Sequence, residues 1–310
     1  MGTKYHGINY GYFFAFFSVF VWGITYISSK YLLRFLTPPE ILICRVIIAY
    51  TVFFIAHPHV YMPKGFRSEV RYFFMGLFGT TLYFLGEIFA LRFSTAANVS
   101  LLASTAPMIT IFIAYFVDKS EKIRPKTIVG GLLCLVGMAL VVLNGKIILK
   151  LNPIGDMLAL TAAFAFAAYS IVTRKIGVSE YPPVVVTRKA FFYALLTLLP
   201  LTATPLIDVH KITLLAQPYI VFNLLFLGVV ASAAGFFSWN KAIWFLGSVK
   251  ATNIMYFMGP LTMLNASLIL NENITIFAMA GSASILLGVY VSQRNEISRA
   301  PSEVADKAER

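Results

Sequence analysis

The stretch Gly76–Phe93 (GLFGTTLYFLGEIFALRF) aligns without a gap with Gly228–Phe245 (GVVASAAGFFSWNKAIWF). Each copy opens on glycine, closes on phenylalanine and carries alanine three positions before that phenylalanine. Other landmarks repeat at equal spacing on both sides of this stretch, namely Lys30 with Arg174, Arg45 with Lys189, Glu121 with Glu272, Gly130 with Gly281, and Gly137 with Gly288. The chain is therefore interpreted as two copies of one unit, residues 10–145 and 153–293, followed by a charged tail, 294–310.

Composition places the chain in a membrane. Of its 310 residues, 59% are hydrophobic and 12% are charged, whereas soluble domains have about 25% charged residues. The net charge of +12 comes from basic residues in short loops between apolar runs. We therefore expect membrane lipids with anionic headgroups, and no nucleic acid, as partners of these loops. Cys44 and Cys134 lie within apolar runs without metal-ligand spacing and are interpreted as core residues.

Ten apolar runs have the length of roughly 17–25 residues that a transmembrane helix needs. They lie near Tyr10–Ser29, Glu40–Ala56, Tyr72–Leu91, Ala96–Phe116, Thr127–Leu143, Gly155–Thr173, Val184–Pro200, Tyr219–Asn240, Ala251–Leu270 and Ile274–Val291. The sequence thus predicts an all-α integral membrane protein with ten transmembrane helices, five in each unit.

The distribution of Lys and Arg predicts the orientation. With the N-terminus inside, fifteen of the 25 basic residues fall in inner segments and six in outer ones. Cytoplasmic loops carry the excess of Lys and Arg, so both termini are predicted to be cytoplasmic, in the cell (bacterial inner) membrane. Five crossings per unit place the second unit upside down. Inverted repeats of this kind are typical of secondary transporters with a substrate site near the midplane.

The motifs also resemble a known family, the EamA-type drug/metabolite transporter superfamily. The resemblance rests on the Trp22-Gly23 pair in the first span, a proline in the fourth span of each unit (Pro107, Pro260) and the repeated Glu-x8-Gly-x6-Gly element. It covers about Tyr10–Val291 and implies export or exchange of amino acids, other small metabolites or drugs through a cavity between the halves. The sixth span departs from the pattern, because Phe166-Ala167 stands where the aromatic-glycine pair is expected.

Helical spacing selects the candidate pathway. Gly76, Thr80, Tyr83 and Glu87 share one helix face, and similar faces occur in the spans around them. The aromatic, amide and acidic side chains on such faces are the candidate substrate-binding residues: Trp22, Tyr26, Tyr83, Glu87, Tyr169, Trp239, Asn253 and Tyr256. The alternative for small and polar positions is helix packing, and for Trp and Tyr it is anchoring at the membrane interface.

Glu87 is the carboxylate placed clearly inside an apolar span, where an ionised group costs at least about 2.5–3.5 kcal/mol. Two functional roles fit it, binding of a substrate ammonium group or carriage of a coupling proton. The alternatives are a structural ion pair with Arg45 and snorkelling to the outer surface.

Other charged and special residues have two interpretations each. Arg45 and Lys189 occupy equivalent places and are candidates for the two charged mouths, or for snorkelling to headgroups. Pro107 and Pro260 are candidate hinges, or static bends. The repeated glycines of the fifth and tenth spans suit close helix contact. The family resemblance places that contact away from the pathway or between protomers. The second alternative would make the protein a homodimer.

Catalytic motifs do not occur in the sequence. It has no glycine-rich phosphate loop, no His or Cys pair with metal spacing and no Gly-x-Ser-x-Gly. We therefore expect no enzyme activity, no cofactor and no metal. The predicted function is secondary transport of a small-molecule substrate by alternating access, with export or exchange of amino acids or related amphipathic solutes. The alternatives are an exporter of hydrophobic drugs or lipids and, from another class, a membrane-embedded enzyme or a scaffold.

Overall fold

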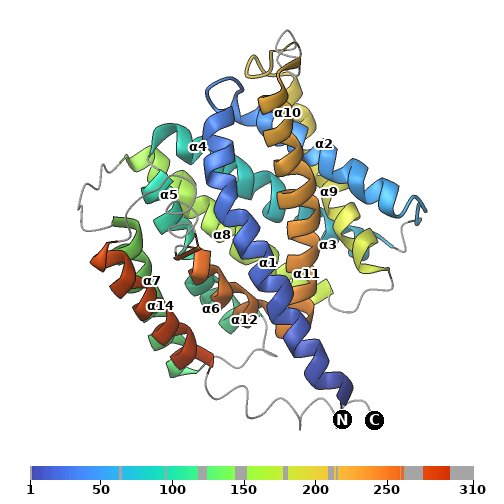
Figure 1. Ribbon diagram of the computed structural model, residues 1–310. Coiled ribbons are helices and arrows are strands. Elements are labelled where there is room, and N and C mark those ends of the chain that lie inside the picture. Colours follow the sequence, from blue (N-terminus) through green and yellow to red (C-terminus); the bar gives the residue numbers. More distant parts are fainter. Residues whose placement is uncertain are drawn as a thin grey trace.

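The computed structural model describes residues 2–62, 65–94, 96–117, 124–143, 152–176, 181–208, 213, 216–258, 260–261 and 275–293. The regular elements within these ranges are all helices (Figure 1). In the first half they are α1 (Gly2–Leu32), α2 (Pro38–Ala56), α3 (Phe66–Gly76), η1 (Leu77–Leu82), α4 (Tyr83–Phe93), α5 (Ala96–Ala103), α6 (Ala106–Val117) and α7 (Pro125–Leu143). In the second half they are α8 (Pro153–Ile176), α9 (Pro183–Thr202), α10 (Pro218–Leu225), η3 (Phe226–Ala234), α11 (Gly235–Leu246), α12 (Ser248–Asn253), η4 (Ile254–Phe257) and α14 (Ile276–Gln293).

Six helical stretches in the described residues are long and apolar enough to cross a membrane. They are Asn9–Leu32, Pro38–Ala56, Phe66–Phe93, Pro153–Ile176, Pro183–Thr202 and Pro218–Leu246. These match the first three and the sixth to eighth predicted spans, and the prediction of an all-helical, multi-pass membrane protein is confirmed. The fourth, fifth and tenth predicted spans correspond to shorter apolar helices, Leu101–Val117, Pro125–Val141 and Met279–Ser292. Part of the ninth span and the tail 294–310 lie outside the described residues.

Helix α2 begins at a capping box. The Thr37 backbone N–H donates to Glu40 Oε2 at 2.7 Å, and the Glu40 N–H donates in return to Thr37 Oγ1 at 3.5 Å. Pro38 and Pro39 fill the first helical positions, where no N–H is needed. In the second half α9 likewise starts at a proline, Pro183. The repeated Pro-Pro pair therefore marks the start of the same helix in each half.

The two aligned stretches share a local irregularity. Each contains a π-helical segment, η1 in the first half and η3 in the second, between two α-helices. With the alignment of Gly76 on Gly228, residues 77–82 of η1 fall on 229–234, inside η3. A π-helical turn inserts an extra residue into the helix and re-aims the side chains that follow, and such turns are frequent at functional sites. The helical spacing in the sequence had predicted regular α-helices here.

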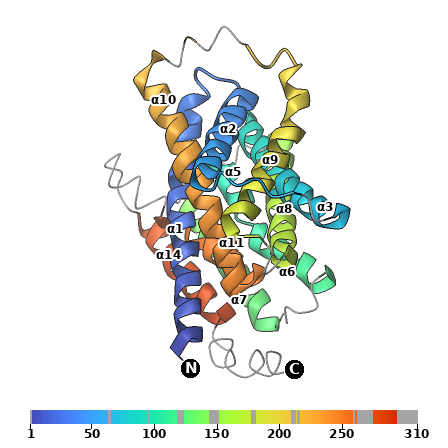
Figure 2. The ribbon, with the colours of Figure 1, turned by 90° about the vertical axis from the view of Figure 1, so that its right-hand side faces the viewer.

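Helices of one half pack on helices of the other. Helix α1 packs on α11, α8 on α4, and α7 on α14 (Figures 1 and 2). At the α7–α14 crossing Gly130 faces Gly288 and Gly137 faces Gly281, so closely that an added Cβ would collide with the backbone opposite. The predicted close contact between the two glycine-bearing spans is confirmed, and it occurs within one chain.

The predicted fourth span is interrupted rather than continuous. Helix α5 ends at Ala103 and α6 begins at Ala106. Pro107 lies in the first turn of α6, and it cannot donate to the Ala103 carbonyl group. The hydroxyl groups of Ser104 and Thr105 donate to the carbonyl groups three residues before them, which closes this turn. Pro260 lies in a helical segment that follows η4, with residue 259 outside the described residues.

Candidate functional site

A cluster of aromatic rings fills the centre of the molecule between the two halves. Trp22 of α1 lies with its ring centroid 5.7 Å from Phe166 of α8 and 5.2 Å from Trp239 of α11. Phe166 also contacts Tyr83 at 5.2 Å and Tyr169 at 5.6 Å. All five side chains are buried. The structure thus brings together four of the predicted site residues around Phe166, which stands where the sequence departs from the family pattern.

The indole N–H groups of the two tryptophans differ in their contacts. Trp22 Nε1 donates to the Ala231 carbonyl oxygen at 2.9 Å, which fastens α1 to η3. One turn earlier, Ser18 Oγ donates to the Gly235 carbonyl oxygen at 2.9 Å. Trp239 is 0% exposed, and its Nε1 has no hydrogen-bond partner within the described part of the chain. Trp22 is therefore a packing residue with a satisfied donor, whereas Trp239 offers a donor to the interior.

Glu87 lies beside this cluster. It is 3% exposed, and it forms a hydrogen bond with the Tyr83 hydroxyl group one turn earlier on α4. Tyr83 in turn contacts the hydroxyl group of Tyr26 on α1. The second carboxylate oxygen, Oε2, is buried and has no hydrogen-bond partner among the described residues. A buried carboxylate with a free oxygen is costly without a bound cation or proton, so this oxygen is suited to receive one.

Arg45 lies in the interior near Glu87, with an exposure of 1%. Its Nε donates to Ser232 Oγ at 2.8 Å, and its guanidinium group lies 3.7 Å from the centre of the Phe84 ring. Arg45 and Glu87 attract one another through the interior, but the direct partners are Ser232 and Phe84 for the arginine and Tyr83 for the carboxylate. Residues of η3 and α4 pack over Arg45, and its role at a mouth of the pathway stays a prediction.

Lys189, the repeat partner of Arg45, is placed differently. Its Nζ forms an ion pair with Glu69 Oε1 at 2.5 Å, and the Tyr193 hydroxyl group donates to Glu69 Oε2 at 2.7 Å. The ammonium group also lies 4.7 Å from the ring centre of Tyr181. Next to it, Arg188 donates to the backbone carbonyl groups of residues 57 and 59. These contacts join α9 to α3 and to the loop between α2 and α3.

Asn253 and Tyr256 do not join the aromatic cluster. Asn253 Nδ2 donates to Ser292 Oγ of α14 at 2.8 Å, and the Tyr256 hydroxyl group lies beside Gly131 of α7. Both are buried, with exposures of 2% and 0%. Their place in the pathway was predicted from the helical spacing of an uninterrupted span, whereas the chain turns through the 3₁₀ segment η4 here. They pack against the α7–α14 pair, and Asn253 Oδ1 and the Tyr256 hydroxyl group have no hydrogen-bond partner among the described residues, so their place in the pathway stays a prediction.

Asn240 is a site residue that the sequence analysis missed. Its Oδ1 accepts a hydrogen bond from the Tyr169 hydroxyl group, and its Nδ2 donates to Thr187 Oγ1 at 3.0 Å. A polar chain thus joins α8, α11 and α9 beside Trp239. The signal in the sequence was an amide directly after the tryptophan in an apolar run. It was overlooked because the residue was placed at the end of its span, next to Lys241.

Comparison with known proteins identifies the family. A sequence profile of the EamA-like transporter family matches residues 9–143 and 153–293. An uncharacterized transporter of Archaeoglobus fulgidus is 24% identical over 89% of this chain and 96% of its own length. A probable amino-acid metabolite efflux pump of Salmonella typhimurium is 25% identical over 90% of this chain and 93% of its own.

A solved crystal structure has the same fold, with a TM-score of 0.71 at 18% identity over 93% of this chain and 98% of that chain. The family match covers both halves of the chain and nearly all of the described helices. The resemblance inferred from Trp22-Gly23, the prolines and the glycine elements is therefore confirmed, and the chain belongs to the EamA-like transporter family of multi-pass membrane proteins.

Proposed function

We propose that this transporter exports or exchanges amino acids or related amphipathic solutes. It binds them between Glu87 and the aromatic cluster that contains Trp239. The single observation that carries the proposal is the buried Glu87 Oε2 without a hydrogen-bond partner in the described chain. A substrate ammonium group placed there would gain a charge-assisted hydrogen bond in an apolar interior. The free Trp239 N–H lies in the same cluster and can donate to a carboxylate. Aromatic walls then suit the apolar part of the solute.

Inverted repeats are part of the proposal. Gly11 faces Phe245, and its repeat equivalent Gly155 faces Phe93, the equivalent of Phe245. A Cβ added at Gly11 would lie 2.8 Å from Phe245 Cβ, and one at Gly155 would lie 3.2 Å from Phe93 Cβ. The antiparallel glycine pairing of α7 with α14 has the same reciprocity. Each contact recurs with the halves exchanged, as a two-fold axis in the membrane plane requires.

Alternating access follows from such an arrangement. The Lys189–Glu69 pair and the Arg188 contacts are the proposed gate that closes one end of the bundle. In the inverted-repeat scheme, rocking of one half against the other opens that end and closes the opposite one around a fixed site. Pro107 lies just after the break between α5 and α6, Pro260 lies shortly after the 3₁₀ segment η4, and these two prolines are the proposed hinges. We assign both termini to the cytoplasm from the excess of Lys and Arg in the inner segments.

Proton coupling fits the same carboxylate. A proton on Glu87 removes its charge and with it the attraction for an ammonium group, so proton and substrate would compete for one site. Arg45 keeps a positive charge nearby, which disfavours binding of a proton and an ammonium group at Glu87 at the same time. The expected cycle is an exchange of proton for substrate across the membrane.

The test is counterflow in proteoliposomes. Purified protein is reconstituted into liposomes loaded with unlabelled amino acids, and entry of each labelled counterpart is measured without an ion gradient. Glu87→Gln should abolish entry while the protein remains monodisperse and helical. Asp156→Asn is the matched control, because it removes one carboxylate at the start of α8, away from the cluster, and should leave entry unchanged.

Two outcomes contradict the proposal. Entry of amino acids that is equal in wild type and Glu87→Gln would exclude the carboxylate as the site. Entry of hydrophobic drugs or lipids, with none for amino acids, would assign the aromatic cluster to the alternative substrate class.

A further inference from the structure

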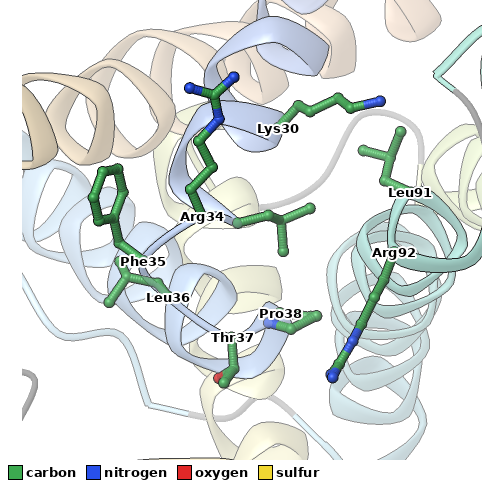
Figure 3. A pocket seen from close by; sticks show the side chains of 9 residues that line it. Lys30, Arg34, Phe35, Leu36, Thr37, Pro38, Leu91 and Arg92 are labelled. Atoms are coloured by element: carbon green, nitrogen blue, oxygen red, sulfur yellow. The ribbon is translucent and has the colours of Figure 1, made fainter.

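A pocket of about 480 Å³ opens at the end of the bundle opposite the Lys189–Glu69 pair. It is formed by the last turns of α1 and α4 and the first residues of α2. Lys30, Arg34 and Arg92 line it together with Leu33, Leu91 and Pro38, among others (Figure 3). The lining contains three basic side chains and no acidic one. An opening with this charge balance attracts anions.

The three charges are not neutralised by neighbouring acids. Arg34 lies 5.9 Å from the ring centre of Tyr31, and no ion pair joins Lys30, Arg34 or Arg92 to an acidic residue among the described residues. In Figure 3, Lys30 extends across the opening toward Leu91, Arg92 runs past Pro38 from the other side, and Arg34 points outward. Lys30 and Arg92 thus flank the opening, and Arg34 adds to the field around it.

The carboxylate of Glu40, two residues after the lining residue Pro38, is bonded elsewhere. Glu40 Oε2 accepts from the Thr37 N–H at 2.7 Å, and Oε1 accepts from the Asp208 N–H at 2.9 Å. The residue is 7% exposed and does not line the pocket. Because Glu40 caps α2, the N-terminus of that helix contributes little to anion binding, and the side-chain cations carry it. Lys30 and Arg92 lie in the last turns of α1 and α4, where the helix dipole stabilises a positive charge. Because both helices end at the same pocket, two cations lie there without an acidic side chain in the lining.

We propose that this pocket, referred to here as the Lys30–Arg92 pocket, binds a carboxylate or phosphate group. Lysine and arginine both form charge-assisted hydrogen bonds with such groups, and arginine binds them in a bidentate manner. The apolar floor of Leu33 and Leu91 leaves room for a short hydrocarbon portion of the ligand. Two sources share this chemistry, the headgroup of an anionic lipid and a soluble anion. Lys30 and Leu91 follow Tyr26 and Glu87 by four residues, so the pocket is lined about one helical turn nearer the helix ends, by residues other than those of the proposed transport site.

The experiment uses the full-length protein in phosphatidylcholine nanodiscs and measures the thermal unfolding midpoint. In one arm inorganic phosphate is titrated at low ionic strength, and in the other phosphatidylglycerol replaces part of the lipid. Lys30→Gln/Arg92→Gln should lower the apparent affinity about tenfold or more, because it removes the charged donors. Arg67→Gln/Arg71→Gln removes the same charge from the exposed start of α3 at the opposite end, and it should behave as wild type.

The two arms identify the source. A stabilisation by phosphate that the Lys30/Arg92 variant loses and the Arg67/Arg71 variant keeps would assign a soluble anion, and the same pattern with phosphatidylglycerol alone would assign a lipid headgroup. Equal stabilisation of wild type and the Lys30/Arg92 variant in both arms, or none in wild type, would overturn the inference. Lys30→Arg/Arg92→Lys keeps the charge and should keep the stabilisation, which separates loss of binding from loss of folding. Glu87→Gln should retain it too, so this inference and the proposed function fail separately.

Discussion

At the scale of single residues, Trp22 and Trp239 show how similar side chains take different roles. Their rings lie 5.2 Å apart in one cluster, and both are buried. The Trp22 N–H donates a hydrogen bond to the Ala231 carbonyl group of the opposite half, whereas the Trp239 N–H has no partner in the described residues. A buried donor without a partner is costly, and such a cost is retained where a ligand can satisfy the group.

Substitution by phenylalanine separates these roles. Trp22→Phe removes the hydrogen bond to Ala231 and should lower the free energy of unfolding by about 1 kcal/mol, the usual size of an interhelical hydrogen bond in a membrane. Trp239→Phe loses the same buried volume but no hydrogen bond, so it should lower the free energy of unfolding by less than Trp22→Phe does while it reduces counterflow. Stability is read from denaturant unfolding in micelles, with Trp244→Phe, which is 38% exposed, as the control. A larger stability loss for Trp239→Phe than for Trp22→Phe would contradict this assignment.

At the scale of elements, the glycines of α7 and α14 act as a contact surface rather than as flexible points. Gly137 and Gly281 face one another, and a Cβ on Gly137 would lie 2.6 Å from the Gly281 carbonyl oxygen and 2.8 Å from Ile285 Cγ1. Backbones this close allow dense van der Waals packing, which drives helix association in lipid. The pair lies at one edge of the molecule and also holds Asn253 and Tyr256 (Figure 1). It is suited to be a rigid support beside the moving parts.

Enlarging one glycine should force this pair apart. Gly137→Val is expected to lower the free energy of unfolding by about 1–3 kcal/mol, as overpacking does in dense cores. Gly281→Val should cost a similar amount, and the double variant less than the sum, because both open the same contact. Val136→Ala, at a position 58% exposed on the same helix, serves as control and should cost less than about 0.5 kcal/mol. Additive effects of the two glycine substitutions would show that the contact is not shared.

At the scale of the whole molecule, the contacts between halves are reciprocal but the ends of the bundle are not alike. One end is fastened by Lys189 with Glu69 and by Arg188, while the other holds the Lys30–Arg92 pocket. The two halves thus give the bundle two different ends. In an inverted-repeat transporter such a difference corresponds to one of two access states.

Labelling from one side of the membrane tests this topology. Arg34 precedes α2 and Arg67 follows it, so the two residues should lie on opposite sides. In a chain with Cys44 and Cys134 replaced by alanine, an impermeant maleimide added to intact cells should label Arg34→Cys, and it should label Arg67→Cys only after permeabilisation. Labelling of Arg67→Cys alone would reverse the proposed orientation. Labelling of both from outside would show that α2 does not cross.

The sequence by itself determined the features that depend on one segment at a time. Apolar length marked the helices, and the Pro-Pro pair marked a helix start, because each follows from local composition and backbone chemistry. Glu87 was singled out for the same reason, since the cost of a carboxylate in a membrane is a property of that residue alone. Sequence motifs were also sufficient to identify the family.

The tertiary structure alone decided which side chains meet. Arg45 is buried against Ser232, Asn253 and Tyr256 face α14 and α7, and Asn240 bonds with Tyr169 and Thr187 beside Trp239. Each outcome depends on how a helix is rotated and how close its neighbour lies, and the π-helical turns and the interruption near Pro107 shift that rotation. A prediction from helical spacing assumes a regular helix and contains no information on the helix that packs against it. It therefore gives neither the rotation of the helix nor its neighbour. Contacts between distant segments supply both.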